Sequence, residues 1–330
     1  MTVIETTGLA KRFGGSGGVV EAVRGVDLRV EAGEIFGFLG PNGAGKSTTL
    51  RMLATLLEPS GGRATVVGQN LLREPARVRE RIDYVSQAGG AEDGSTGLEN
   101  LILQARLYGM GKTEARARGG VLAENLELSS FADRLVKTYS GGQRRRLDLA
   151  LGMVHRPALL FLDEPTIGLD PQSRARLWDE VGRLREEGTT VFVTTHYMDE
   201  ADALCDRVAI MDLGEIVAEG TPEELKREVS GDVIDLSFED GNGALEKAEK
   251  LVRAQSFVRE LQANEGGLRL YVESGEETLP VLLRLFEGVG LAVRTLSLSR
   301  PTLDDVFLKQ TGHTLREAGK VPAPAGVPAT

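Results

Sequence analysis

The chain of 330 residues lacks several features that mark secreted, membrane-spanning and nucleic-acid-binding proteins. It has one cysteine, Cys205, so no disulfide can form within it, which fits a reducing compartment. Its N-terminus has no basic and apolar segments typical of a signal peptide. Its apolar runs, such as residues 158–162, are too short to cross a bilayer. We expect a cytoplasmic protein, and if it works at a membrane, another chain must cross that membrane.

Excess positive charge is also lacking. The 49 acidic residues outnumber the 39 basic ones, which gives a formal net charge of −10. A protein that binds nucleic acid through its phosphates, whatever the base sequence, needs a basic surface. The composition therefore argues against a nucleic-acid partner, while 41% hydrophobic residues suffice for a packed soluble fold.

The most informative segment is residues 40–47, Gly-Pro-Asn-Gly-Ala-Gly-Lys-Ser, which matches the phosphate-binding pattern G-x-x-x-x-G-K-[ST]. An apolar strand pattern precedes it and a helical pattern follows. Glycines let successive backbone N–H groups surround an anion, and the helix N-terminus adds positive potential. We expect Lys46 to reach the β- and γ-phosphates of a nucleoside triphosphate and Ser47 to ligate Mg²⁺. A glycine turn that only caps a helix is the alternative.

Residues 159–164, Leu-Leu-Phe-Leu-Asp-Glu, predict a buried strand that ends in two carboxylates. Asp163 suits a Mg²⁺ site, and Glu164 suits a base that orients and deprotonates an attacking water. A solvated acidic pair is the alternative, but the phosphate-binding loop favours catalysis. His196 follows another apolar segment, residues 190–195, at the sheet edge where α/β folds bind ligands. It could donate to a γ-phosphate, although a single histidine is more often structural.

Three further segments are ambiguous when taken alone. Residues 139–147 form a second glycine loop at a helix start, with Ser140 placed as the cap, and this is either an ordinary turn or a second anion site. Gln87 ends a third apolar segment and could reach Mg²⁺ or an attacking water, or simply begin a surface loop. Phe13 could stack on an adenine ring or belong to the core.

Together these segments resemble the ATP-binding cassette family over about residues 3–225. The resemblance implies an active ATPase that uses ATP and Mg²⁺. Tyr139 and Ile167 depart from the residues usual in the family, but neither departure removes a phosphate ligand. The matching motifs are Walker A (residues 40–47), the Q-loop (Gln87), the signature (residues 140–143), the end of Walker B (Asp163 and Glu164), the D-loop (residues 168–170) and the switch histidine (His196).

The resemblance assigns roles to individual residues of this chain. Catalysis is implied for Glu164, His196, Gln87 and Lys46, and metal binding for Ser47, Gln87 and Asp163. The nucleotide contacts implied are Phe13, Gly40, Asn42, Gly43, Ala44, Gly45, Lys46, Ser47, Thr48, Ser140, Gly141, Gly142, Gln143 and Asp170.

The expected fold is α/β, a P-loop cassette with a mixed sheet at residues 1–230 and a helical insert at about residues 88–157. From residue 231 strand and helix patterns alternate, which predicts a small α+β domain at residues 231–315, of the split-βαβ type. We expect this domain to be regulatory or to stabilise a dimer. Residues 316–330, rich in Pro and Ala, are expected to be disordered.

The motifs also predict partners. One chain has one phosphate loop and one signature loop, so a head-to-tail homodimer would let each signature loop cap the nucleotide held by the partner. Residues 302–308, Thr-Leu-Asp-Asp-Val-Phe-Leu, and residues 139–142 resemble the daunorubicin-resistance type of drug-export ATPase. That resemblance implies a subunit held at the inner face of the membrane by a separately encoded permease. The alternatives are an exporter of lipid or another non-drug cargo, and a soluble single-cassette ATPase that acts on ribosomes or nucleic acid.

Overall fold

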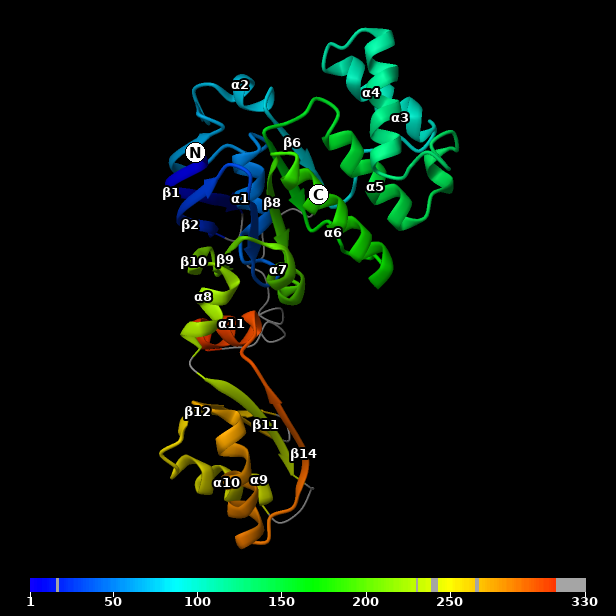
Figure 1. The fold of residues 1–330 in the computed structure, drawn as a ribbon. Coiled ribbons are helices and arrows are strands. Elements are labelled where there is room, and N and C mark those ends of the chain that lie inside the picture. Colours follow the sequence, from blue (N-terminus) through cyan, green and yellow to red (C-terminus); the bar gives the residue numbers. More distant parts are fainter. Residues whose placement is uncertain (16–17, 230, 239–242, 265–266, 313–330) are drawn as a thin grey trace. The chain divides into compact units, whose positions relative to one another are not determined.

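The computed structural model describes residues 1–312 except 16–17, 230, 239–242 and 265–266. The chain forms two compact units, Met1–Thr221 and Pro222–His313 (Figure 1). The sequence placed the boundary at residue 230, whereas the division in the structure falls after residue 221, because α8 (Pro222–Glu228) packs on α11 (Leu303–Thr311) of the second unit. The tail predicted to be disordered lies outside the described residues. No helix in the described ranges is long and apolar enough to cross a bilayer.

A six-stranded sheet forms the centre of the first unit, in the order β10-β9-β3-β8-β7-β6. All neighbouring strands in it are parallel except β10 and β9. The ring of Phe192 packs on Phe36, Phe38 and Phe161, and all four are fully buried, as expected for parallel strands covered on both faces. The strands are β3 (Ile35–Leu39), β6 (Ile82–Val85), β7 (Leu159–Asp163), β8 (Thr190–Thr195), β9 (Arg207–Asp212) and β10 (Glu215–Gly220).

A second, antiparallel sheet shares a hydrophobic core with the first, so the mixed architecture predicted from the sequence is confirmed. Its strands are β2 (Gly18–Glu31), β1 (Thr2–Gly15), β4 (Gly61–Val66) and β5 (Gln69–Asn70), in that order. The first two form a long hairpin, in which Phe13 pairs with Val20 and the ladder continues to Gly15 and Gly18. Other helices of this unit are α1 (Lys46–Leu53), α2 (Pro75–Arg79), α6 (Pro171–Glu186) and α7 (Met198–Leu204).

The helical insert lies between β6 and β7, as predicted. It contains α3 (Gly97–Leu107), α4 (Lys112–Asn125), a short 3₁₀ turn (Val136–Thr138) and α5 (Gly141–Gly152). Thr96 and Glu99 form a reciprocal capping box at the start of α3. Figure 1 shows α3 and α4 set to one side of the central sheet, with α5 between them and the core.

A polar cluster fastens this insert to the central sheet. Tyr108 follows α3 and stacks on His155, with ring centroids 3.8 Å apart. Its hydroxyl donates to Asp83 Oδ2 at 3.1 Å, and His155 Nε2 lies 3.0 Å from Ile82 O on the same strand. Burial raises the pKa of Asp83 to about 6 and lowers the pKa of His155. Asp83 is therefore a carboxyl whose charged form the fold disfavours.

The second unit contains a four-stranded antiparallel sheet in the order β12-β13-β11-β14. The chain order β-α-β-β-α-β with this strand order confirms the predicted split-βαβ fold. Edge strand β12 was not predicted, because its sequence Val-Arg-Glu-Leu-Gln-Ala-Asn has little of the apolar alternation of a covered strand. The elements are β11 (Asp232–Phe238), α9 (Ala244–Arg253), β12 (Val258–Asn264), β13 (Gly267–Val272), α10 (Gly275–Gly288) and β14 (Val293–Ser299).

The segment that resembles the drug-export subgroup forms the start of α11 and is largely buried. Leu303, Val306 and Phe307 are at most 1% exposed. Asp305 completes a capping box with Thr302, and its Oδ1 accepts hydrogen bonds from residues 269 and 271 of β13, both at 3.1 Å. This segment therefore holds a helix within the second unit.

We predict that Asp83→Asn changes how the stability of the first unit depends on pH. Between its ordinary pKa of 3.8 and about 6, Asp83 keeps a proton in the folded state that the unfolded chain releases, so its contribution to stability falls as pH rises through this range. The difference in unfolding free energy between wild type and variant should change by on the order of 2–3 kcal/mol from about pH 3.5 to 7.

Urea unfolding followed by fluorescence of Trp178, the only tryptophan, measures this difference. Asp179→Asn, at an exposed site on the same helix as Trp178, is the matched control and should run parallel to wild type. A parallel pH profile for Asp83→Asn would contradict the prediction.

Candidate active site

The phosphate-binding loop joins β3 to α1 and has the close backbone packing that its glycines permit. At Gly40 a Cβ would lie 2.1 Å from Met211 O, and at Gly45 it would lie 2.5 Å from Ala22 O. Both glycines also have positive φ, 143° and 106°. No other residue fits either position without displacing the main chain.

Lys46 is buried at the end of this loop. Its ammonium donates to Gly40 O at 2.7 Å and Pro41 O at 3.0 Å, and it lies 3.5 Å from Glu164 Oε1. Burial lowers the pKa of Lys46, while the carboxylate of Glu164 opposes this effect. A cation at the start of α1, where backbone N–H groups are free of helical partners, suits the binding of a phosphate.

Asp163 is the centre of a hydrogen-bonded cluster at the carboxyl edge of the sheet. Its Oδ1 accepts from Ser47 Oγ at 2.9 Å and from Thr194 Oγ1 at 2.7 Å, and its Oδ2 accepts from Tyr84 OH at 3.0 Å. Burial raises the pKa of Tyr84 to about 12, so the phenol remains a donor. Two of the three predicted metal ligands, Ser47 and Asp163, thus lie together and offer the hydroxyl and carboxylate oxygens that Mg²⁺ prefers.

Glu164 occupies a turn of unusual backbone geometry. Its φ of 46° lies in the left-handed region, which raises the energy of a non-glycine residue by about 1 kcal/mol. Its N–H donates to Thr194, to Oγ1 at 3.0 Å and to the carbonyl at 3.2 Å. Its carboxylate lies 3.2 Å from His196 Nδ1 and 3.5 Å from Lys46 Nζ. Three of the four predicted catalytic residues therefore converge here, beside the predicted metal ligands.

Gln87 is not part of this convergence. It is exposed in the turn that follows β6, and across the described residues no hydrogen bond joins it to Ser47 or Asp163. Phe13 lies on β1, half-buried, with Lys11 Nζ 5.3 Å from its ring centroid. The ring keeps the partial exposure that stacking on a base requires.

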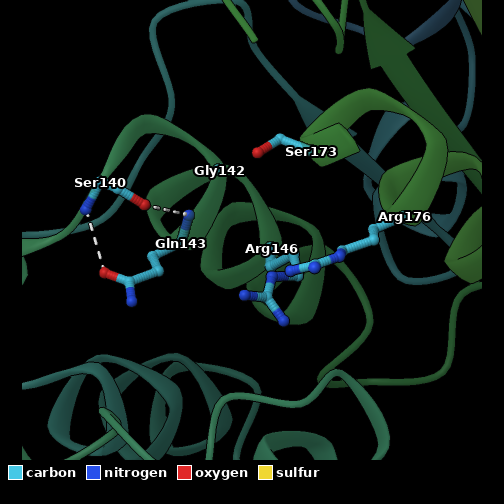
Figure 2. Close-up of a pocket in the computed structure, with 6 residues that line it drawn as sticks. All are labelled: Ser140, Gly142, Gln143, Arg146, Ser173 and Arg176. Atoms are coloured by element: carbon cyan, nitrogen blue, oxygen red, sulfur yellow. Dashed lines mark hydrogen bonds between the residues drawn. The ribbon is translucent and has the colours of Figure 1, made fainter. Parts of the chain in front are cut away.

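The signature residues lie at the start of α5, where Ser140 and Gln143 form a reciprocal capping box (Figure 2). They border a hollow of about 150 Å³ that no residue of the phosphate-binding loop lines. Asp170 caps α6, its Oδ1 accepting from the N–H groups of Gln172 and Ser173 at 3.1 and 3.0 Å. The lining residues of the hollow are Ser140, Gly142, Gln143, Arg146, Ser173 and Arg176.

Two residues of the Asp163 cluster, Tyr84 and Thr194, were missed by the sequence analysis. Both lie on strands near their carboxyl ends, where a polar residue in an apolar segment is the available signal. That signal does not say which partner the hydroxyl finds, because the partners are 79 and 31 residues away in the sequence.

Comparison with known proteins agrees with this geometry. The family described as ABC transporter matches residues 23–167, and the family described as ATP-binding protein DrrA1-3-like, C-terminal domain, matches residues 220–311. The daunorubicin/doxorubicin resistance ATP-binding protein DrrA of Streptomyces peucetius is 47% identical over 94% of this chain and 92% of its own length. This chain belongs to the ABC transporter family. It is an ATP-binding subunit of an ABC transporter and an ATPase.

Other members of the ABC transporter family show the range of this resemblance. The Nod factor export ATP-binding protein I of Burkholderia lata is 37% identical over 95% of this chain and 98% of its own length. A solved ATP-binding cassette, a dimer in a post-hydrolysis state bound to ADP and Pi, superposes with a TM-score of 0.61 at 26% identity. The superposition covers 66% of this chain and 98% of the solved cassette. The family binds ATP, and Mg²⁺ is normally required.

We predict that Thr194→Val lowers ATP hydrolysis at least about tenfold, because it removes a donor to Asp163 and an acceptor of the Glu164 N–H in one step. It should also destabilise the first unit by about 1–3 kcal/mol, since two buried groups each lose a partner. Steady-state ATPase assays and urea unfolding measure the two effects.

Thr190→Val is the matched control on the same strand. The Thr190 hydroxyl is also buried and accepts from Gly33 N at 3.0 Å, at the opposite end of β8 from the site. It should lower stability without changing kcat by more than about twofold. Equal losses of kcat in the two variants would contradict a specific role for Thr194.

Proposed function

We propose that this protein hydrolyses ATP to drive a separately encoded membrane permease, and that the cargo is a drug or antibiotic carried outward. The observation that supports the catalytic part is the convergence of Lys46, Asp163, Glu164 and His196 at the carboxyl edge of one sheet. The export part is supported by the drug-resistance protein at 47% identity.

The site residues divide the chemistry between them. Lys46 and the N–H groups of its loop would hold the β- and γ-phosphates. Ser47 and Asp163 would hold Mg²⁺, which would supply positive charge beside the transferred phosphoryl group. Glu164 orients a water and takes its proton, and its carboxylate lies 3.5 Å from the Lys46 ammonium. His196 orients Glu164 by donating Nδ1–H to its carboxylate, and in the imidazolium form its Nε2–H would donate to the γ-phosphate. Gln87, at the exposed tip of its turn, joins the site when the nucleotide is bound.

A single chain is incomplete as a nucleotide clamp. The signature residues face a hollow that is separate from the phosphate-binding loop of the same chain, so they are positioned to act on a nucleotide held by a second copy. Two-fold pairing brings both signature loops onto both nucleotides at once. The solved relative that is a dimer supports this arrangement. The second unit, with its own core, would stabilise or regulate that dimer.

The dimer is testable with the Glu164→Gln variant, which binds the nucleotide but lacks the base that consumes it. Sedimentation velocity with excess Mg-ATP should show a dimer, because the γ-phosphate joins the two copies. The same protein with Mg-ADP is the control and should sediment as a monomer. A monomer in excess Mg-ATP would contradict the proposal.

The permease is testable by purifying tagged Glu164→Gln protein from its native cells with Mg-ATP. A polytopic membrane protein at equal stoichiometry should co-purify from detergent-solubilised membranes. Recovery of ribosomes or nucleic acid in its place would contradict a transport function.

Cargo has a second candidate, because the Nod factor export relative is 37% identical over nearly the whole chain. Drug export is favoured by the higher identity of the daunorubicin-resistance protein. Cells that carry the protein and its permease should tolerate several-fold more of the exported drug than cells with Glu164→Gln. Equal tolerance to every drug, with loss of another exported compound, would favour the second candidate.

A further inference from the structure

Arg145 has no role in the chemistry described above, yet it is among the most elaborately bonded residues near the site. It lies on α5, two residues after the signature motif, and is 8% exposed. Its guanidinium donates to three main-chain carbonyls. Nε donates to Pro165 O at 2.8 Å, Nη1 to Ser86 O at 2.7 Å, and Nη2 to Asp163 O at 3.3 Å.

Two of these carbonyls flank Glu164. Arg145 therefore donates to the carbonyls on both sides of Glu164, the residue with the left-handed backbone. The N–H of Glu164 itself donates to Thr194 on β8. A guanidinium is planar and presents its N–H groups in a fixed fork, so it fixes the spacing of the carbonyls it contacts. The backbone conformation that aims the Glu164 carboxylate is thus defined by contacts from β8 and α5.

The third carbonyl belongs to Ser86, the residue before Gln87. Arg145 and Asp148, one helical turn apart on α5, both contact the turn of residues 86–91. Asp148 Oδ1 accepts from Gly90 N at 2.9 Å and Ala91 N at 3.3 Å. At Gly89 a Cβ would lie 2.6 Å from Asp148 Oδ2, so the turn is packed directly against the carboxylate. Gln87 is exposed at the tip of this turn.

We propose that Arg145, supported by Asp148, is a positioning residue that couples the turn carrying Gln87 to the main chain around Glu164. A displacement of residues 86–91 is transmitted through one rigid guanidinium to the carbonyls on both sides of the base. Among the described residues no hydrogen bond joins Arg145 to the phosphate-binding loop, and Arg145 does not line the hollow at the signature residues. We therefore expect its effect to fall on the rate of hydrolysis more than on nucleotide binding. This inference rests on the catalytic role proposed for Glu164.

The test is Arg145→Gln in the full-length protein. A glutamine amide is shorter and has one nitrogen, so it cannot span the three carbonyls. We expect kcat to fall roughly 30–100-fold, as for a small misplacement of a catalytic group. The Kd of a fluorescent ATP analogue should stay within about twofold of wild type, because the contacts of Lys46 are unchanged.

Arg118→Gln is the matched control. Arg118 also donates to two main-chain carbonyls, Val154 O at 2.9 Å and Met153 O at 2.6 Å. Both carbonyls lie just after the C-terminal end of α5, whereas Arg145 lies near its N-terminal end. The Arg118→Gln variant therefore loses guanidinium-to-carbonyl hydrogen bonds that lie away from the Glu164 turn. We expect its kcat to remain within about twofold of wild type.

Hydrogen–deuterium exchange of nucleotide-free protein gives a readout that does not involve catalysis. Arg145→Gln should speed exchange in both residues 86–91 and residues 163–167, whereas Arg118→Gln should change neither. In a Glu164→Gln background, adding Arg145→Gln should lower the residual rate by less than about twofold, because the two residues act through one group.

The outcomes separate this inference from the proposed function. If Glu164→Gln is inactive while Arg145→Gln keeps the wild-type kcat, the coupling is wrong and the catalytic assignment stands. If Glu164→Gln retains wild-type activity, the catalytic assignment itself fails. Should Arg145→Gln not fold, Arg145→Lys, which reaches fewer carbonyls, is expected to lower kcat about tenfold with unchanged Kd, and an unchanged kcat would overturn the inference.

Discussion

The site depends on one buried carboxylate, that of Asp163, and on the need to satisfy it. A charge that is 3% exposed is costly unless hydrogen bonds replace water. Here three hydroxyls, from α1, β6 and β8, supply those bonds. Because each donor comes from a different element, the carboxylate fixes the relative positions of the phosphate-binding loop and two neighbouring strands. The positions of Ser47, Tyr84 and Thr194 around the site therefore follow from the need to hydrogen-bond the buried Asp163 carboxylate.

The next residue shows the consequence. Glu164 follows β7 with a left-handed backbone, and hydrogen bonds from its N–H to Thr194 and from Arg145 to the carbonyls on either side hold that turn. The direction of its carboxylate, toward Lys46 and His196, is therefore set by the ends of β8 and by α5. A carboxylate held in this way responds to movement of the elements that hold it.

Local patterns predicted the parts of the structure that local physics determines. The phosphate-binding loop, β7 with its two carboxylates, the capping role of Ser140 and the split-βαβ unit were all anticipated, because each leaves a periodicity or a turn signal in a short segment. Edge strand β12 lacks such a signal. The partners of Tyr84, Thr194 and Arg145 were also beyond reach, since their hydrogen bonds join residues separated by 18 to 79 positions in the sequence. Gln87 was expected at the end of an apolar segment and lies there, but its separation from Ser47 and Asp163, the other two predicted metal ligands, is a property of tertiary structure.

The second unit shows why a motif that identifies a subgroup need not be a contact site. The segment at residues 302–308 pointed to drug-export ATPases, and a simple interpretation would make it a surface for cargo or permease. In the structure Leu303, Val306 and Phe307 are buried, and Asp305 is bonded to Thr302, Arg269 and Tyr271. A partner could reach these side chains only by unfolding α11. The segment therefore specifies how the second unit is built.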